Sequence, residues 1–215
     1  MSYLDIVNNI LKRLRERTVS TVNESSYSSL IAVLVNDAKE TVENAFQWSG
    51  LRTTLTATTT NGTFNYELNG SLNAVTVLDV INVTDNFFLK PKGSHEFNKL
   101  FLSNNVGTGS PYYYSFNGIS TDGDTKVDLY PIPDTEYTIR FNCVLRTADL
   151  VNDADKITIP TKPIELLAHA LAVEERGEDG GMTSVSAYAR ATTALQDAVA
   201  LDSNKHSEEL VWYES

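Results

Sequence analysis

The hydrophobic periodicity of this chain changes twice along its length. Apolar residues recur at helical spacing up to Gly50, alternate with polar residues between Leu51 and Leu145, and return to helical spacing after Ile159. The pattern predicts an α+β fold, with a four-helix layer from the N- and C-terminal segments and a central antiparallel β-rich insertion. The expected domains are an α-helical domain of residues 1–50 and 160–202, a β-rich insertion domain of residues 51–159, and a C-terminal extended tail of residues 203–215.

Two helices are predicted before Gly50. The first starts at the beginning of the chain, where Ser2 and Asp5 have the S-x-x-D spacing of a capping box. Its last turns carry a basic cluster that suits the negative end of the helix dipole: Lys12, Arg13, Arg15 and Arg17. The second helix is predicted to run for about 22 to 26 residues. We expect it to end at Gly50, with Trp48 near its end covering a hydrophobic core.

Two further helices are predicted after Pro160. We expect Thr161 to cap the first of them, Pro163 to lie in its first turn, and Gly177 to end its apolar stripe. The last helix is expected to bury one face, made of Val185, Tyr188, Ala191, Leu195, Ala198 and Val199.

The middle of the chain is rich in Thr, Val, Tyr and Phe, which favours strands. One hairpin is predicted around Asn61-Gly62, a pair typical of a primed turn. A second is predicted over Asp128–Val144, around the sequence Pro-Ile-Pro-Asp, with Cys143 as a small apolar residue on the buried face.

Two more strands and a short helix are predicted in the same region. Tyr112–Ser120 and Thr125–Tyr130 are expected to flank a polar loop. Ser94 is expected to cap a helix over Ser94–Leu102.

The sequence holds no catalytic, cofactor-binding or metal-binding constellation. A calcium loop through the acidic residues near Gly123 would lack the bidentate glutamate that such loops need: Asp122, Asp124 and Asp128. The adjacent Glu174 and Glu175 are expected to be a solvated helix end rather than an acid–base pair. The three histidines have no neighbouring cysteine or spaced carboxylates: His95, His169 and His206. We therefore predict a protein that is not an enzyme and binds no cofactor or metal.

Charge and cysteine content limit the classes of protein to which this chain can belong. The 215 residues carry a net charge of −11 and one cysteine, so an internal disulfide framework is excluded. A chain this acidic is not expected to bind DNA by counterion release, although it could surround DNA without adhering to it. Neither a secretory signal nor a run long enough to span a membrane is expected from the sequence.

The C-terminal tail carries one apolar cluster: Leu210, Val211, Trp212 and Tyr213. Two interpretations are open. The tail folds back on its own domain, or it docks its aromatic side chains into a partner protein.

The order of these segments resembles the head-to-tail adaptor (connector) proteins of tailed bacteriophages, of the tail tubular or portal-adaptor type. The resemblance is carried by LDIVNNILKRL, FQWSGLRTTLTA, NYEL, VDLYPIPDTEYTIRF and ITIPTKPIELLAHALAVEERGED. The most telling part is the YPIPD segment followed by a helix that begins IP-x-x-P-x-E-L-L. The similarity extends in order and spacing over residues 1–200, and the tail after Asp202 lies outside it.

This resemblance implies a structural virion protein. Such proteins form a homo-oligomeric ring of about twelve copies under the portal protein. The ring contacts a tail nozzle, tube or stopper protein on its other side, and double-stranded DNA passes through its lumen without specific binding. The implied location is the phage neck, after assembly in the host cytoplasm. The implied portal-docking segment is Leu210 to Tyr213.

A tail-associated carbohydrate-binding or cell-wall-degrading β protein is the alternative. It would need an aromatic platform, for which Tyr112, Tyr113 and Tyr114 are the candidates. Alternation along a strand places Tyr113 opposite the other two, which argues against a flat platform of all three.

Overall fold

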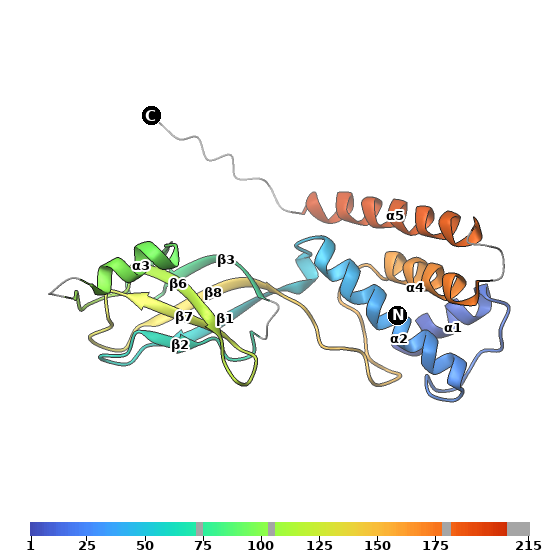
Figure 1. Ribbon diagram of the computed structural model, residues 1–215, viewed down its shortest axis with the longest axis horizontal. Helices are drawn as coiled ribbons and strands as arrows, with labels where there is room; N and C mark the ends of the chain where they lie inside the picture. The colour runs from blue at the N-terminus through green and yellow to red at the C-terminus, as the bar shows by residue number, and fades with distance from the viewer. Residues whose placement is uncertain (72–74, 103–105, 178–181, 206–215) are drawn as a thin grey trace. The chain divides into compact units, whose positions relative to one another are not determined.

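The computed structural model describes residues 1–71, 75–102, 106–177 and 182–205. The chain divides into two compact units, a helical unit (Met1–Leu51 and Thr147–Ser215) and a β unit (Arg52–Arg146). Helices α1, α2, α4 and α5 belong to the first unit, and eight strands with helix α3 belong to the second (Figure 1). The predicted α+β class is therefore confirmed.

Helix α1 (Tyr3–Arg13) begins where the sequence predicts. Ser2 Oγ accepts from the Asp5 amide at 3.2 Å, and the Asp5 carboxylate accepts from the Ser2 amide at 2.9 Å. This reciprocal pair satisfies two amides that a helix N-terminus would otherwise leave without partners. The apolar stripe of α1 is buried, at Ile6, Val7, Ile10 and Leu11.

Helix α2 (Ser26–Ala45) is shorter than predicted, and the prediction that it ends at Gly50 is wrong. Its 20 residues stop where Phe46 takes an extended backbone, and the short 3₁₀ helix η1 (Ser49–Leu51) follows. Gly50 is needed for a different reason. A Cβ at this position would lie 2.4 Å from the carbonyl oxygen of Thr158, so only glycine allows the returning chain to pass this close. Trp48 is fully buried, as predicted.

Helices α4 (Thr161–Arg176) and α5 (Met182–Ser203) complete the helical unit. Gly177 ends α4 in the left-handed conformation with φ of +61°, as its sequence predicts. The prediction that Thr161 caps α4 is wrong, because the cap is Pro160 and Thr161 is already the first helical residue. Helix α4 contacts α5, α2 and α1, and α1 also contacts α2 (Figure 1).

The buried face of α5 is built on small residues. Ala191 and Ala198 are buried as predicted and Ala187 joins them, whereas Val185 is exposed, contrary to prediction. The larger apolar residues predicted for this face are only partly buried: Tyr188, Leu195 and Val199.

The β unit contains two four-stranded sheets. The first has the order β1-β8-β3-β4, from β1 (Arg52–Thr58), β8 (Thr138–Leu145), β3 (Val75–Asn82) and β4 (Phe87–Phe88). The second has the order β2-β7-β6-β5, from β2 (Asn65–Glu67), β7 (Thr125–Tyr130), β6 (Tyr113–Ile119) and β5 (Lys90–Pro91). All described pairs are antiparallel except β5 with β6. Both sheets contribute to one hydrophobic core, which includes Val80, Val127, Leu129, Ile139 and Phe141.

Neither of the two predicted hairpins forms. Strand β1 pairs with β8 rather than with β2, and β7 pairs with β2 and β6 rather than with β8. At the first turn the Thr63 amide donates to the Thr60 carbonyl, and of the two central residues only Gly62 has a positive φ. This is the geometry of a type II turn, not of a primed hairpin turn. Both connections carry the chain from one sheet to the other.

The remaining predictions for the middle of the chain have mixed outcomes. Strands β6 and β7 pair across the polar loop, and Cys143 is fully buried, as predicted. Burial raises the pKa of the Cys143 thiol. Helix α3 (Ser94–Phe101) is present, but its cap is Gly93 and no side chain caps it, so the predicted role of Ser94 is wrong.

Candidate functional site

The histidines do not gather with other metal-binding side chains. Within residues 1–71, 75–102, 106–177 and 182–205, no group of three or more His, Cys, Asp or Glu side chains is placed to hold a metal ion. His169 is half-buried on α4, where burial, with Arg13 and Arg190 nearby, lowers its pKa. His95 is exposed on α3, and His206 lies outside the described residues.

The acidic residues around Gly123 do not form a calcium loop. Asp128 is buried and accepts hydrogen bonds from the side-chain amides of Asn65 and Asn117, the latter at 2.9 Å. Its carboxylate therefore links β2, β7 and β6. Asp122 is exposed in the turn.

Glu174 and Glu175 do not act as a pair. The Tyr188 hydroxyl of α5 donates to the Glu174 carboxylate of α4 at 2.5 Å, while Glu175 is exposed. Burial and this hydrogen bond raise the pKa of Tyr188 to about 12. The contact joins two helices.

The three consecutive tyrosines do not form a sugar platform. The rings of Tyr112 and Tyr113 stand at 89° to each other with centroids 5.0 Å apart, and Tyr114 is buried in the β-unit core. The Lys92 ammonium lies 4.4 Å from the centre of the Tyr113 ring. A flat aromatic surface, which stacking on a sugar requires, is not present on these residues.

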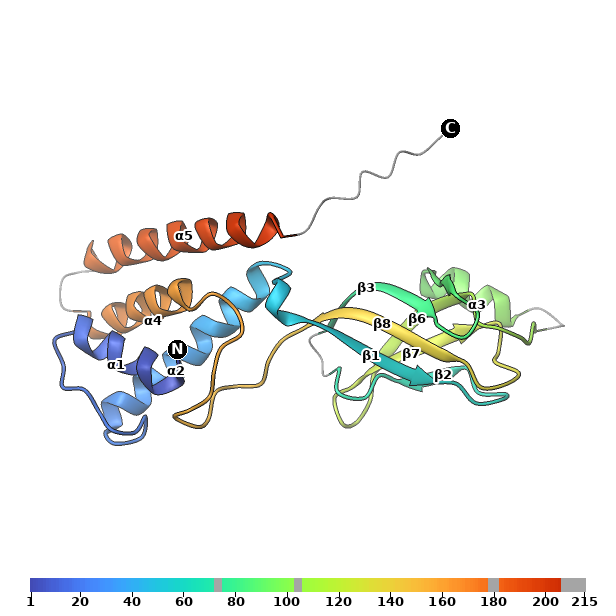
Figure 2. The same cartoon turned by 180° about the vertical axis from the view of Figure 1, so that it is seen from behind.

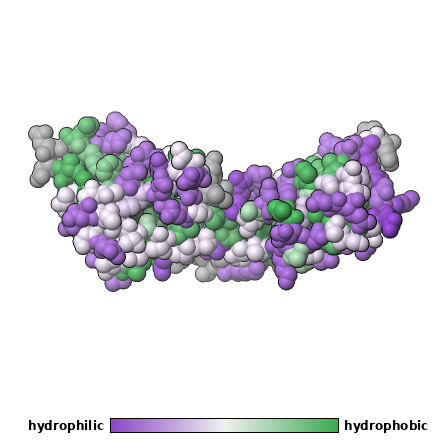
Figure 3. All heavy atoms as spheres, turned by 90° about the horizontal axis from the view of Figure 1, so that it is seen from below, coloured by the Kyte–Doolittle hydropathy of each residue, from purple (hydrophilic) through white to green (hydrophobic). Residues whose placement is uncertain are grey.

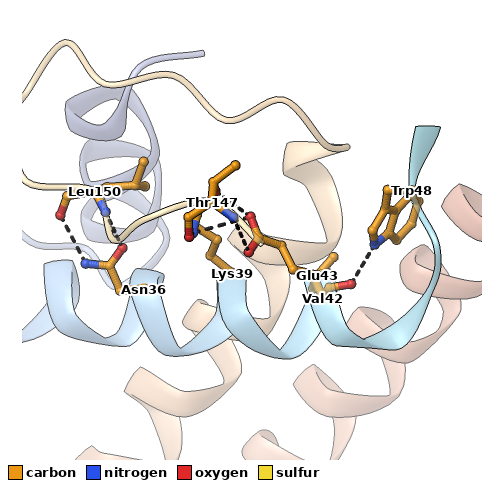
Figure 4. Close-up of polar contacts among 7 residues, drawn as sticks. All are labelled: Asn36, Lys39, Val42, Glu43, Trp48, Thr147 and Leu150. Carbon is orange, nitrogen blue, oxygen red and sulfur yellow. Dashed lines mark hydrogen bonds and ion pairs between the residues drawn. The ribbon is translucent and has the colours of Figure 1, made fainter. Parts of the chain in front are cut away.

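A buried set of polar contacts fixes the returning chain to α2 (Figure 4). We call these contacts the polar seam: Asn36, Lys39, Glu43, Thr147 and the backbone of Leu150. Asn36 donates to the Leu150 carbonyl at 3.1 Å and accepts from its amide at 2.9 Å. Lys39 Nζ donates to the Thr147 carbonyl at 2.9 Å, and the Thr147 hydroxyl donates to Glu43 at 2.6 Å.

The ion pair of the polar seam is almost completely removed from water. Lys39 is 2% exposed and Glu43 is 4% exposed, with their charged atoms 3.3 Å apart. Burial of two charges is unfavourable unless hydrogen bonds satisfy their remaining donors and acceptors. Thr147 supplies these bonds from its hydroxyl, amide and carbonyl groups. Residues 147–159, which the sequence analysis placed with the β-rich insertion, start at this contact.

Sequence analysis missed the polar seam, although one signal was present. Lys39 follows Ile31 and Val35 at four-residue spacing, so it lies within the buried stripe of α2 rather than on its solvated face. A lysine in such a stripe requires a buried partner.

The end of α5 is held by a second polar contact. The buried Asp202 carboxylate accepts from the Ser49 amide at 2.7 Å, from the Ser49 hydroxyl at 2.6 Å and from Lys205 Nζ at 2.7 Å. Burial alone would raise the pKa of Asp202, but the hydrogen bonds from Lys205 and Ser49 outweigh it and lower the pKa to about 2. The contact joins the last turn of α5 to η1.

Replacing Asp202 with asparagine is expected to reduce the free energy of unfolding by about 1–2 kcal/mol at pH 7. The folded pKa lies below the unfolded value, so the stabilisation is present above pH 4 or so and is lost as the pH falls toward 2. Urea unfolding of wild type and D202N at several pH values measures this difference, which should shrink on acidification. D197N, at an exposed position of the same helix, is the matched control. An equal loss in both variants, or a difference that does not change with pH, would contradict the assignment.

A hollow of about 490 Å³ beside α1 and α4 contains three arginines: Arg13, Arg15 and Arg176. Arg13 pairs with Glu165 at 2.7 Å, and Arg176 binds Glu16, Tyr27 and the Leu14 carbonyl. Two of the three positive charges are thus neutralised within the unit, so the hollow does not form a strongly positive anion site.

The surface of the chain carries both hydrophobic and hydrophilic residues. On the face shown in Figure 3, hydrophobic residues reach the surface in separate patches among hydrophilic ones. None of the helices in the described part of the chain is long and apolar enough to cross a membrane. The portal-docking candidates Leu210, Val211, Trp212 and Tyr213 lie outside the described residues.

The class of this protein follows from a comparison with known protein families. A family model described as SU10 adaptor protein matches residues 1–210. The chain therefore belongs to the SU10 adaptor protein family, and its resemblance to head-to-tail adaptors is confirmed. No curated protein matches it.

Proposed function

We propose that copies of this chain form a ring of about twelve subunits under the portal protein and connect it to the tail. On this proposal the four helices of the helical unit form one layer of the ring, and the chain acts as a structural component without enzymatic activity. Its partners are further copies of itself, the portal protein, a tail nozzle, tube or stopper protein, and the double-stranded DNA in the lumen. Its place is the neck of the virion, after assembly in the host cytoplasm.

The observation that carries this proposal is the match of an adaptor family model to nearly the whole chain. The buried polar contacts of the helical unit support it, since a subunit that must repeat at a fixed angle benefits from a rigid structure.

The charge of the chain also supports passage of DNA through the ring. Twelve copies of a chain with net charge −11 carry about −130 in total. A negatively charged lumen would repel the DNA phosphates. Because it would release no counterions from the DNA, it would lack the main source of non-specific affinity, and the DNA would slide without adhering.

Electron microscopy of the chain mixed with purified portal protein is expected to show an additional annulus on one end of the portal. A variant that lacks residues 210–215 should keep the wild-type circular dichroism spectrum and thermal midpoint but lose the annulus, because it lacks the proposed aromatic anchor, Trp212 and Tyr213. The substitution Leu201→Ser, at an exposed residue of α5, is the control and should leave the annulus intact. No annulus with the full chain would refute the proposed function, and normal attachment of the truncated chain would refute only the docking role of the tail.

A further inference from the structure

Strand β1 is a long, regular strand with one unpaired edge. It is the terminal strand of its sheet and pairs with β8 over seven consecutive residues without a bulge. At the end of this ladder the Thr59 amide donates to the Tyr137 carbonyl, so the backbone groups of Thr59 point toward the β8 side. The direction of the backbone N–H and C=O groups alternates along an antiparallel strand. The residues whose backbone groups point away from β8 are therefore Arg52, Thr54, Thr56 and Thr58. In the described part of the β unit no further strand accepts these amides.

The other described sheet edges carry the features that normally prevent edge-to-edge pairing. Strands β4 and β5 have two residues each, and β5 contains Pro91. Strand β2 has three residues, one of them the charged Glu67. The part of β6 beyond β5 is irregular, with a register shift and a positive φ at Gly118. Strand β1 has no proline and no bulge, and its one charge is at its start, so its edge is suited to accept another strand.

A second uncovered edge lies on the opposite side of the same sheet. Strand β4 pairs with β3 at Ile81 and Asn82, and the Leu89 amide donates to the Val80 carbonyl, which leaves the Val75–Asp79 part of β3 without a neighbour on that side in the described chain. This part has a register shift between Val77 and Asp79 in its pairing with β8. Because β1 and β3 are both antiparallel to β8, they run in the same direction on either side of it (Figure 2).

We propose that β1 of one copy pairs, in parallel, with the Val75–Asp79 segment of β3 in the next copy. This inference rests on the proposed function and gives the ring its subunit contact. The two edges lie on opposite sides of one sheet, so each copy presents one edge to each neighbour. That is a heterologous contact, which generates closed rings when the rotation closes.

Charge favours the same pairing over contact between two β1 edges. Arg52 is the sole charged residue of β1, and Asp79 is the sole charged residue of β3. Pairing β1 with β1 would join two strands that each carry an arginine, whereas pairing β1 with β3 joins strands that carry one charge of each sign. Thr54, Asn142 and Asp79 already form one hydrogen-bonded row across the sheet, and the proposed contact would extend this row into the next copy.

Disulfide trapping on portal-bound rings tests the pairing. Thr54→Cys is combined in turn with Thr76→Cys and with Leu78→Cys, because both partners are exposed residues of the uncovered edge. Neighbouring strands hold their Cα atoms about 5 Å apart, a distance that a disulfide spans. Oxidation is expected to give a ladder of covalent multimers beyond the dimer. The buried Cys143 should not contribute, and Thr54→Cys alone should remain monomeric. Dimers from Thr54→Cys alone would overturn the proposal in favour of paired β1 edges.

A proline substitution tests the same edge independently. Thr54→Pro removes an amide that faces away from β8, so the monomer should keep its fold while ring formation falls at least tenfold. Phe116→Pro, at an outward-facing amide of β6, is the matched control and should assemble normally. Wild-type chains that never form rings would overturn both this proposal and the proposed function. Rings that show neither the multimer ladder nor sensitivity to Thr54→Pro would overturn the edge pairing alone.

Discussion

Replacing Lys39 with methionine is expected to lower the free energy of unfolding by about 3–5 kcal/mol. Methionine fills a similar volume but leaves the Glu43 carboxylate buried without its ammonium partner, and it leaves the Thr147 carbonyl without a donor. The loss should therefore exceed that of an ordinary apolar substitution. Urea unfolding followed by circular dichroism measures it.

An exposed ion pair provides the matched control for K39M. Lys126 and Glu67 lie 3.6 Å apart in the β unit with side chains that are 33% and 45% exposed. K126M should cost less than about 1 kcal/mol, because water already screens this pair. If K39M and K126M have equal effects, the energetic role of the polar seam is wrong.

The double variant K39M/E43Q separates charge from packing. Glutamine keeps hydrogen-bonding capacity toward Thr147 without a buried charge, so the double variant should be more stable than K39M alone. A double variant that loses the sum of both single losses would indicate that the two side chains act independently. Comparison of the wild type, the two single variants and the double variant therefore distinguishes an ion pair from two separate hydrogen-bonded groups.

The helical parts of the fold were largely predictable because their information is local. The Ser2–Asp5 capping box, the buried stripe of α1 and the left-handed Gly177 depend on residues only a few positions apart. Predictions failed where a distant segment decided the structure. Gly50 looked like a helix terminator, but it is fixed by Thr158, which lies more than a hundred residues away in the sequence.

The strands were recognisable from alternation, but their partners were not. Period-2 patterns identify which face of a strand is buried and carry no information on which strand lies beside it. The turn at Asn61-Gly62 was consistent with a hairpin, yet β1 and β2 entered different sheets. The polar seam was missed for a related reason, because Lys39 and Glu43 become a buried pair only when Thr147 returns to α2.

Replacing Trp48 with alanine is expected to cost about 3–5 kcal/mol, through loss of buried apolar area and the cavity that remains. Trp48 is fully buried after the end of α2, and its ring contacts Phe46 edge-on with centroids 5.3 Å apart. Its indole N–H donates to the Val42 carbonyl at 2.7 Å, which satisfies one of the acceptors at the helix C-terminus (Figure 4). For a chain of this size the loss corresponds to a drop in the thermal midpoint of roughly 10 °C.

The variant W48F separates the two contributions of Trp48. Phenylalanine keeps most of the ring in the core but cannot donate to Val42, so its loss should be about half of the loss in W48A, from a smaller cavity and one unpaired carbonyl. Replacing the exposed Val33 of α2 with alanine is the control and should change the midpoint by no more than about 2 °C. If W48A unfolds at the same temperature as V33A, Trp48 does not hold the end of α2, and the rigid connection between α2 and η1 on which a fixed subunit shape depends would be absent.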